Sequence, residues 1–421
     1  MSTSTASIPA VSAPESPARF PLGALLLLGL AVLVTVTAES LPTGLMPEMA
    51  ASFGVEPLGI GLLISVWAVT VIVTSIPLAR ATASLDRRVV VAVSLGVFAL
   101  ANVATALAPD YGFAMASRIV AAVAHGVFWA IVIVYATALV APAHLGRGLA
   151  IVTAGGTAAT VVGLPGATIL AQASDWRAAF VVIGVGALAL AAAVLLWMPR
   201  VVAPRPDTAA RGALRRDATL PAVLAFGIAS VLIAVAQFTS FTYIRPYLEQ
   251  QAGLAASWSG PLLLVFGLAG IAGVAGAGVL VDRHPRTALT GTLGLFAAAL
   301  TALTLWPHVP AVVVAGVAVW GLAMGAVFPL IQTALMRTAS ERLRVLASAG
   351  VVVFFNVGIT AGTWLGGVLD GAGPTTVNTA VSAAVMVGAA AIAVLGGVLG
   401  ARAARRGEAA RQAEAAPRAE G

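Results

Sequence analysis

One carboxylate, Glu39, stands at the end of a long apolar run near the start of the chain. The run from Leu22 to Ala38 holds no ionisable residue in seventeen positions. A charge in such a place is costly in lipid, so we expect Glu39 to face protein or a water-filled cavity and to have a function. The chemistry open to such a group is the uptake and release of a proton. Pro42 and Gly44 follow within about two turns and predict a bend or an unwound stretch beyond the carboxylate.

Two residues on a later apolar run, Arg118 and His125, could act on this carboxylate. Their spacing of seven places them on one face of a helix. If this span runs from outside to inside, Arg118 lies at a depth similar to that of Glu39 and His125 lies near the middle. An Arg and a carboxylate at matching depth are natural partners, because either one alone is costly in a low-dielectric site. We therefore predict Glu39 as the proton carrier, tuned by Arg118, with His125 lining the route. A static structural ion pair is the alternative.

The composition places these residues in a membrane protein. Of 421 residues, 60% are hydrophobic and 9% are charged, whereas a soluble domain carries roughly 25% charged residues. Helices satisfy their backbone hydrogen bonds within one segment, so long apolar runs predict an all-α polytopic membrane protein. There is no Cys, and the four His have no metal-ligand spacing, so we expect no metal and no cofactor. The chain has no Lys, which excludes a nucleotide-binding GxxxxGKS/T loop and ATP-driven transport by this chain alone.

Twelve apolar runs reach the roughly 20 residues that a membrane-spanning helix needs. They lie at 21–46, 58–80, 89–108, 112–140, 148–172, 177–198, 220–248, 258–281, 287–306, 310–336, 345–369 and 375–400. Arg residues cluster in every second connection and at both ends of the chain, whereas the alternate connections are mostly acidic. This bias predicts a multi-pass protein of the cytoplasmic (inner) membrane with both termini in the cytoplasm.

The longest polar stretch between spans divides them into six and six. Two weak sequence matches relate the halves: Pro47 aligns with Pro246, and the Asp86-Arg87 pair aligns with Asp282-Arg283. Together these features predict 6+6 pseudo-symmetric halves around a central cavity. The predicted segments are a disordered cytoplasmic tail at 1–19, a six-helix bundle at 20–198, a cytoplasmic linker at 199–218, a second bundle at 219–400 and a second disordered cytoplasmic tail at 401–421.

Acid–base runs in two equivalent loops are candidate gates. The loop after the second span holds Asp86, Arg87 and Arg88, and the loop after the eighth holds Asp282 and Arg283. An acid followed by bases in a tight turn can bridge to a neighbouring helix end and break when the halves rock. The alternative is a plain positively charged cytoplasmic loop. Because the run occurs twice at matching places, we favour the gate.

The fifth span carries a second candidate gate, at Gly163, Pro165 and Gly166. Small residues let helices approach closely, and a proline frees a carbonyl group and kinks the helix. Close packing alone would account for the glycines. A Gly-Leu-Pro-Gly run in the middle of a span is more than packing requires, so we predict a bend that helps to seal the cavity.

The spans of the second half hold few polar residues, and aromatic residues accompany them. A mostly apolar wall with a few hydrogen-bonding groups is typical of a small-molecule cavity. The candidate substrate-binding residues are Gln237, Phe238, Tyr243, Gln332 and Asn356. Ordinary hydrogen bonding between helices is the alternative for each of them. Arg245, beside Pro246, is expected to extend its side chain toward the membrane surface.

Several runs resemble one known family. The run 37–47 (TAESLPTGLMP) is similar to the first-helix signature of the drug/proton antiporter branch of the major facilitator superfamily, which has twelve spans. Arg118 with the run 125–129 (HGVFW) resembles its fourth-helix motif, and 155–166 resembles its fifth-helix antiporter motif. The runs 175–177 (DWR), 242–248 (TYIRPYL), 320–322 (WGL) and 355–358 (FNVG) also fit. Bacterial arabinose and sugar efflux permeases and chloramphenicol exporters belong to this branch. The resemblance adds Phe128 and Trp129 to the candidate substrate-binding residues.

The resemblance implies proton-driven efflux of a small organic molecule, such as a phenicol or a sugar, by alternating access. A proton symporter or a uniporter is the alternative within transport. A membrane transferase is the alternative from another class, but such enzymes hold a metal–diphosphate with clustered acids, and the acids here are isolated. We therefore expect a transporter and no enzyme. Its expected partners are a small-molecule substrate, protons and the lipid bilayer, without nucleic acid, and the chain is expected to act as a monomer.

Overall fold

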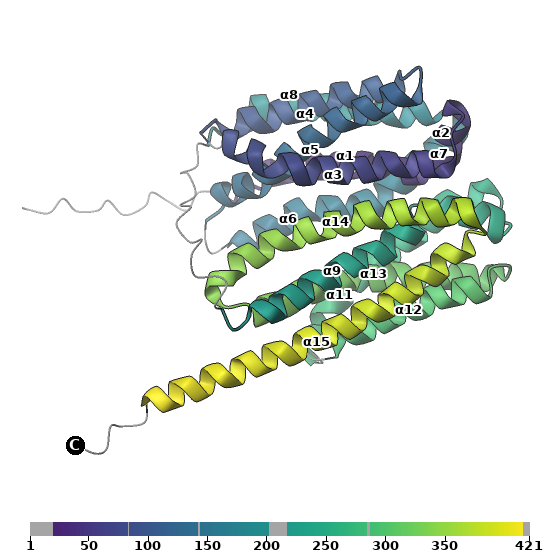
Figure 1. The fold of residues 1–421 in the computed structure, drawn as a ribbon. Coiled ribbons are helices and arrows are strands. Elements are labelled where there is room, and N and C mark those ends of the chain that lie inside the picture. Colours follow the sequence, from purple (N-terminus) through teal and green to yellow (C-terminus); the bar gives the residue numbers. More distant parts are fainter. Residues whose placement is uncertain (1–19, 83, 142–143, 202–216, 284–286, 416–421) are drawn as a thin grey trace, which may run out of the picture.

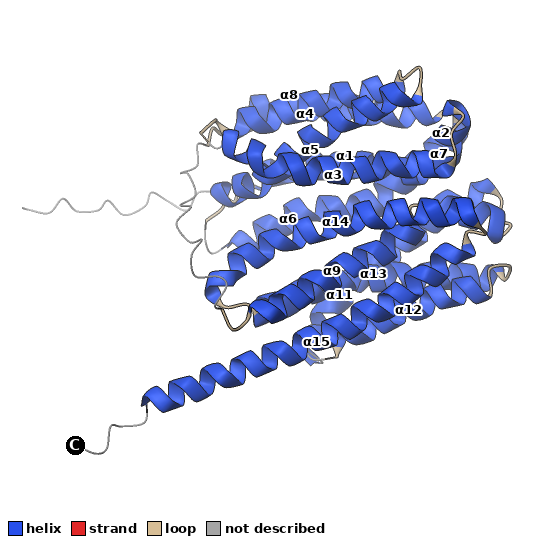
Figure 2. Ribbon diagram, in the orientation of Figure 1, coloured by secondary structure: helices blue, strands red, loops and turns tan. Residues whose placement is uncertain are grey.

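The structure is a computed structural model that describes residues 20–82, 84–141, 144–201, 217–283 and 287–415. Throughout these ranges the regular secondary structure is helical, with no strand (Figure 2). The all-α prediction is therefore confirmed. The predicted tail at 1–19 and most of the predicted linker lie outside the described residues.

The first half of the chain forms six spans, two of which are interrupted. Its helices are α1 (Leu22–Gly44), α2 (Met46–Phe53), α3 (Pro57–Ala81), α4 (Arg87–Ala106), α5 (Tyr111–Leu139), α6 (Leu145–Ala158), η2 (Ala159–Gly163), α7 (Leu164–Ala173) and α8 (Trp176–Trp197). The break predicted beyond Glu39 is confirmed, because α1 contains Pro42 and ends at Gly44. The fifth span is α6, η2 and α7 in sequence, and η2 is a single π-helical turn just before Pro165.

The second half also forms six spans, but its fifth span, α14 (Glu341–Ala372), is one continuous helix. Its helices are α9 (Leu220–Phe241), α10 (Ile244–Pro246), η4 (Tyr247–Gln251), η5 (Ala256–Trp258), α11 (Ser259–Arg283), α12 (Ala288–Leu305), α13 (Pro310–Thr338), α14 (Glu341–Ala372) and α15 (Thr376–Ala415). The predicted span 220–248 is not one continuous helix. It ends at Phe241, and a turn, α10 and the π-helical η4 follow it.

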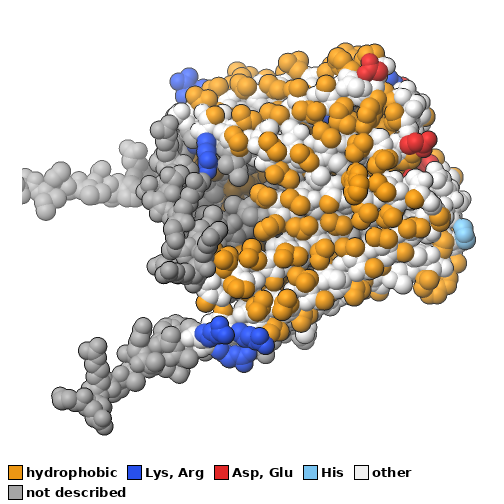
Figure 3. Space-filling model, in the orientation of Figure 1, with side chains coloured by type: hydrophobic (Ala, Val, Ile, Leu, Met, Phe, Trp, Pro, Cys, Tyr) orange, Lys and Arg blue, Asp and Glu red, His pale blue; other side chains and the backbone are white. Residues whose placement is uncertain are grey.

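Eleven helices of the described residues are long and apolar enough to cross a membrane. The span predicted at 345–369 corresponds to α14, which is not among those eleven. With 32 residues it exceeds the ~20 that a span needs, and part of it lies outside the residues whose side chains the structure describes. The arrangement is thus consistent with a twelve-helix membrane protein. Apolar side chains cover the flank of the bundle, as a lipid-facing surface requires (Figure 3).

The two halves lie side by side (Figure 1). We call the end that holds α2, η4 and η5 the distal end, and the end near residues 199–201 and 217–219 the proximal end. The close contacts between the halves lie toward the distal end. The halves meet where α3 packs on α14 and where η2 and α7 pack on α11. Gly267 of α11 lies directly against the backbone of Val161, and no side chain separates the two helices there.

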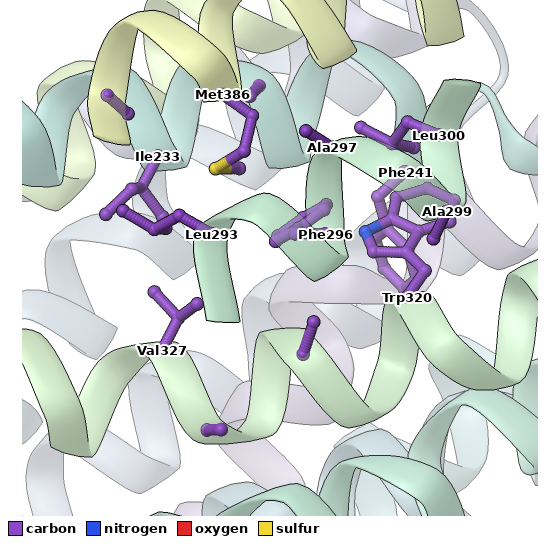
Figure 4. Close-up of a cluster of buried hydrophobic side chains, with 14 of the residues drawn as sticks. Ile233, Phe241, Leu293, Phe296, Ala297, Ala299, Leu300, Trp320, Val327 and Met386 are labelled. Carbon is purple, nitrogen blue, oxygen red and sulfur yellow. The ribbon is translucent and has the colours of Figure 1, made fainter. Parts of the chain in front are cut away.

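Each half also has its own apolar core. In the second half, Leu293, Phe296, Trp320 and Met386 interlock between α12, α13 and α15 (Figure 4). The first half is filled by two clusters, one around Trp67 and Phe98 and the other around Leu28, Phe128 and Tyr135.

The prediction of a disordered tail at 401–421 is wrong for most of its length. Helix α15 continues without a break through Ala415 (Figure 1). The segment after residue 400 is rich in Ala, Arg, Glu and Gln, which are strong helix formers. Because they follow directly on a formed helix, no new nucleation is needed. The polar composition excludes this segment from the membrane but does not end the helix.

Candidate functional site

The candidate site lies between α1, α3 and α5 in the first half. Glu39 projects from α1 toward α5, and its Oε2 lies 3.5 Å from Nε2 of His125. The Glu39 side chain is 23% exposed, whereas that of His125 is 5% exposed. The carboxylate therefore has one side on the protein and one side open, as a group that exchanges protons needs.

Arg118 lies beside this carboxylate but bonds to the main chain. Its two terminal nitrogens donate hydrogen bonds to the carbonyl oxygens of Ala38, at 2.9 Å, and Glu39, at 3.2 Å. Pro42 has no N–H group, so the Ala38 carbonyl four residues earlier lacks its helical partner. Arg118 supplies the missing donor, and its guanidinium lies 4.1 Å from the centre of the Trp67 ring.

The predicted side-chain ion pair between Arg118 and Glu39 is thus corrected. Among the described residues, the basic side chain within ion-pair distance of the Glu39 carboxylate is His125. Arg118 shares the depth of Glu39, as expected, but the free carbonyl of Ala38 competes for its donors. The spacing of residues along the sequence predicts the depth of Arg118 and Glu39. It does not predict the rotation of α1 about its own axis, which decides whether the Glu39 side chain or the main chain faces Arg118.

His125 is enclosed by rings. The centroid of its imidazole lies 5.2 Å from Trp67, 6.3 Å from Phe98 and 6.2 Å from Trp129. Its Nδ1 is buried without a hydrogen-bond partner in the described part of the chain. The predicted shared face of Arg118 and His125 is confirmed, since both turn toward α1 from α5.

The predicted bend of the fifth span packs against α1. A Cβ atom added at Gly163 would overlap Oγ1 of Thr37, two residues before Glu39. Pro165 lies in the first turn of α7, and a Cβ atom at Gly166 would meet nothing within 4 Å. Gly163 therefore allows the fifth span to approach the site, while Gly166 faces open space.

Three of the predicted substrate-binding residues are buried in packing. The Oε1 atom of Gln237 accepts a hydrogen bond of 2.8 Å from the indole of Trp320. Phe128 is 1% exposed and belongs to an apolar core. Tyr243 is fully buried, and its hydroxyl donates to the carbonyl oxygen of Thr363 at 3.0 Å.

The other four are partly exposed. They are Trp129, Phe238, Gln332 and Asn356. Phe238 meets Phe355 edge to face and packs with residues of α3 and α14, so it lies where the halves meet. Gln332 borders a wide, open hollow, together with Pro329, Thr333, Met336 and Arg337 of the same helix.

The predicted gate at Asp86, Arg87 and Arg88 ties three segments together at the proximal end. Asp86 caps α4 by accepting from the backbone N–H of Arg88, and it also accepts from the N–H of Val201. The Arg88 side chain donates to the Leu195 carbonyl on α8, and the Arg87 N–H donates to the Val201 carbonyl. Asp282 and Arg283 end α11, and their side chains lie outside the described residues.

Sequence reasoning missed two features of the molecule. Trp67 carries no charge and gave no signal, yet it contacts both Arg118 and His125. The prediction that Arg245 extends to the surface is wrong, because this side chain is 1% exposed. It is ion-paired with Glu48 and Glu249. The four-residue spacing of Arg245 and Glu249 was the available signal, since such pairs meet on a helix.

The sequence as a whole matches the model of one family, described as the Major Facilitator Superfamily, over residues 28–363 and again over 276–419. The chain belongs to the Major Facilitator Superfamily. It is also 33% identical over 349 residues to a chloramphenicol efflux pump of Mycobacterium tuberculosis (strain CDC 1551 / Oshkosh). The match covers 81% of this chain and 84% of that pump, and the values are the same for a chloramphenicol efflux pump of strain ATCC 25618 / H37Rv.

Solved structures of two other transporters share the fold of this superfamily member. A bacterial homologue of the human lysosomal transporter Spinster, in an inward-facing and occupied conformation, matches with a TM-score of 0.71 at 15% identity. That match covers 93% of this chain and 98% of the other. A mutant of the peptide transporter POT in complex with alafosfalin matches with a TM-score of 0.72 at 14% identity, over 92% and 96% of the two chains. These structures show the fold alone, whereas the family match makes this superfamily member a multi-pass membrane transporter of small molecules.

Proposed function

We propose that this chain is a proton-driven exporter of a small organic molecule, with Glu39 as the proton carrier. It works as a monomer in the cytoplasmic membrane by alternating access. Both termini lie in the cytoplasm, so the distal end faces outward. The visible acidic side chains lie mainly toward the distal end and the visible Arg toward the proximal end, which supports this orientation (Figure 3).

The observation that carries the proposal is the setting of the Glu39 carboxylate. It is partly exposed, and its nearest basic partner is His125 at 3.5 Å. That distance exceeds a normal hydrogen bond, so the contact does not hold the carboxylate in one state. Arg118 is committed to two main-chain carbonyls and remains in place whether Glu39 carries a proton or not. The site can therefore change its protonation without losing its structure.

The same geometry suggests how protonation is coupled to movement. In this proposal the units 20–198 and 219–400 rock about the cavity between them, with 199–218 as the linker and 401–421 as a cytoplasmic extension. Glu39 lies on α1, and η2 packs on both α1 and α11. The bend at Gly163, Pro165 and Gly166 would transmit a shift of α1 across to the second half. The loops at Asp86–Arg88 and Asp282–Arg283 would close the proximal end.

Chloramphenicol is the first substrate to test, because the curated relatives are chloramphenicol efflux pumps. We propose that the four partly exposed candidates, Trp129, Phe238, Gln332 and Asn356, contact the substrate. The buried candidates, Phe128, Gln237 and Tyr243, then form the wall behind them. Apolar rings with a few amides suit a neutral molecule that carries both aromatic and hydrogen-bonding groups.

The test is proton movement in proteoliposomes that contain a pH dye. Chloramphenicol added outside an antiporter enters in exchange for protons, so the lumen becomes more alkaline. We expect this change for the wild type and for Glu56→Gln, whose carboxylate is exposed at the start of α3. Glu39→Gln should abolish it. Acidification of the lumen would indicate a symporter, and substrate uptake without proton movement would indicate a uniporter. Either outcome overturns the proposal.

A further inference from the structure

The segment between α9 and η4 crosses from the second half to the first at the distal end. Arg245 lies in this segment and donates a 2.9 Å hydrogen bond to the carbonyl oxygen of Gly44, which ends α1. The same nitrogen is ion-paired with the Glu48 carboxylate of α2. Both contacts join residues about 200 positions apart, so one side chain of the second half bonds the distal ends of two first-half helices.

Tyr243, two residues earlier, fills a notch between the halves. The notch is formed by glycines of both halves: Gly61 of α3, and Gly366 and Gly367 of α14. A Cβ atom added at Gly61 or Gly367 would overlap the Tyr243 hydroxyl, and one at Gly366 would press on its ring. The ring is thus seated where α3 and α14 meet and is fully buried there.

The charges of this cluster are divided unequally between the halves. Arg245 is paired within its own half with Glu249, whose Oε1 lies 2.7 Å from Nη2. Its pair with Glu48 crosses to the other half. If the halves separate at the distal end, Arg245 loses Glu48 and Gly44 but retains Glu249. A buried charge that keeps one partner can move, whereas a charge left without any would be too costly.

We infer that Tyr243 and Arg245 form a distal lock, which closes the outer side of the transporter and must open once in each cycle. The Arg245–Glu48 ion pair breaks when the lock opens, and the Tyr243 ring is the plug that fills the notch while the lock is closed. Glu249 is the companion that stays paired with Arg245, which lowers the free-energy cost of opening. The lock rests on alternating access and does not depend on proton coupling at Glu39.

A single engineered cysteine can report on the lock, because the natural chain has none. Ser65 of α3 is 4% exposed, and its hydroxyl donates to the Thr360 carbonyl of the other half. It lies four residues beyond Gly61, about 6 Å deeper along the helix. Ser65→Cys therefore places a thiol behind the plug. Its labelling by a membrane-impermeant maleimide, added outside intact cells, measures how often the distal end opens.

Two matched variants of the full-length Ser65→Cys protein test the lock. Glu48→Gln removes the cross-half ion pair, and we expect the labelling rate to rise by about tenfold or more, which corresponds to about 1.4 kcal/mol or more. Glu249→Gln removes the companion but leaves the cross-half pair, so the labelling rate should not rise. Arg177→Gln, which breaks an exposed pair at the same end, should leave it unchanged.

The result that overturns the inference is equal labelling of the Glu48→Gln and Glu249→Gln variants. Tyr243→Phe provides a second opening variant if Glu48→Gln does not fold, as judged by size-exclusion chromatography. It removes the hydroxyl that touches Gly61 and should also raise the rate. If neither variant raises it, there is no lock. Labelling needs no proton gradient, so this outcome is independent of the proteoliposome test of Glu39.

Discussion

In each half the first span contacts the fourth, but the side chains that join them differ between the two halves. In the first half, Arg118 of α5 bonds the main chain of α1, and His125 of α5 contacts the Glu39 carboxylate. In the second half, Trp320 of α13 donates a neutral hydrogen bond to Gln237 of α9. The same pair of helices thus carries ionisable groups in one half and an uncharged pair in the other.

The packing of the second span on the fourth explains why only the first half has space for ionisable groups between its spans. In the second half, α11 and α13 touch backbone to backbone, since a Cβ atom added at Gly273, Gly321 or Gly325 would overlap main-chain atoms of the other helix. In the first half, the Trp67 ring of α3 lies under the Arg118 guanidinium of α5. Close glycine contacts leave no volume for buried charges, whereas the side chains between α3 and α5 enclose them. Within the proposed mechanism, this difference places the proton chemistry in the first half, because the α11–α13 contact of the second half has no space for ionisable side chains.

The largest effect should follow the loss of Arg118. Arg118→Met keeps much of the volume but leaves the Ala38 carbonyl without a donor, takes one donor from the Glu39 carbonyl and removes the charge beside the Glu39 carboxylate. Breaking a buried charged network of this kind costs about 3–5 kcal/mol of folding free energy. We expect a marked loss of thermal stability in detergent and no transport. Arg177→Met, at an exposed pair, should cost no more than about 1 kcal/mol. Equal destabilisation by the two variants would contradict the role given to Arg118.

A smaller effect is expected where the second half packs through glycine. In Gly325→Ala the new methyl group would overlap the Gly270 carbonyl, so α11 and α13 must separate. Overpacking of this kind costs typically about 1–3 kcal/mol. In Gly126→Ala, between α3 and α5, the methyl group would meet the Ser75 hydroxyl, which can rotate away. Thermal unfolding should therefore show a clearly larger loss for Gly325→Ala. The comparison between the halves fails if Gly126→Ala is the more damaging.

The sequence supplied the class of fold and the depth of the site. Apolar run lengths predicted the spans, and Pro42 with Gly44 predicted the end of α1. The seven-residue spacing correctly placed Arg118 and His125 on one face of α5. Periodicity is enough for such statements because it depends on one helix at a time.

What the sequence could not supply depends on two helices at once. The partner of Arg118 was decided by a carbonyl that Pro42 leaves free on another span. Arg245 was expected at the surface, but its surroundings come from α1 and α2, about 200 residues away. The continuation of α15 past residue 400 is a third case, since a polar segment stays helical when a formed helix precedes it.

The neutral pair of the second half should matter for stability and not for coupling. Gln237→Leu leaves the buried indole N–H of Trp320 without an acceptor, which costs about 1–3 kcal/mol. Adding Trp320→Phe removes the other partner, so the double variant should lose less than the sum of the single losses. Thermal unfolding of the four proteins gives the coupling energy. The number of protons moved per substrate should stay at the wild-type value throughout. A changed ratio would mean that proton chemistry extends into the second half.

The smallest effect should come from His125, and it decides whether Glu39 acts alone. The Glu39–His125 contact is 3.5 Å long, beyond the usual range of a strong hydrogen bond. In His125→Gln the amide retains a donor near the carboxylate, so we expect the transport rate to fall by less than about tenfold, which corresponds to ~1.4 kcal/mol. Proton movement per substrate, measured in the same proteoliposomes, should be unchanged, whereas Glu39→Gln abolishes it. Phe98→Leu, which alters the enclosure of His125 without changing its chemistry, serves as the packing control. If His125→Gln uncouples transport as completely as Glu39→Gln does, the imidazole is an obligatory proton carrier, and the site of coupling is the pair.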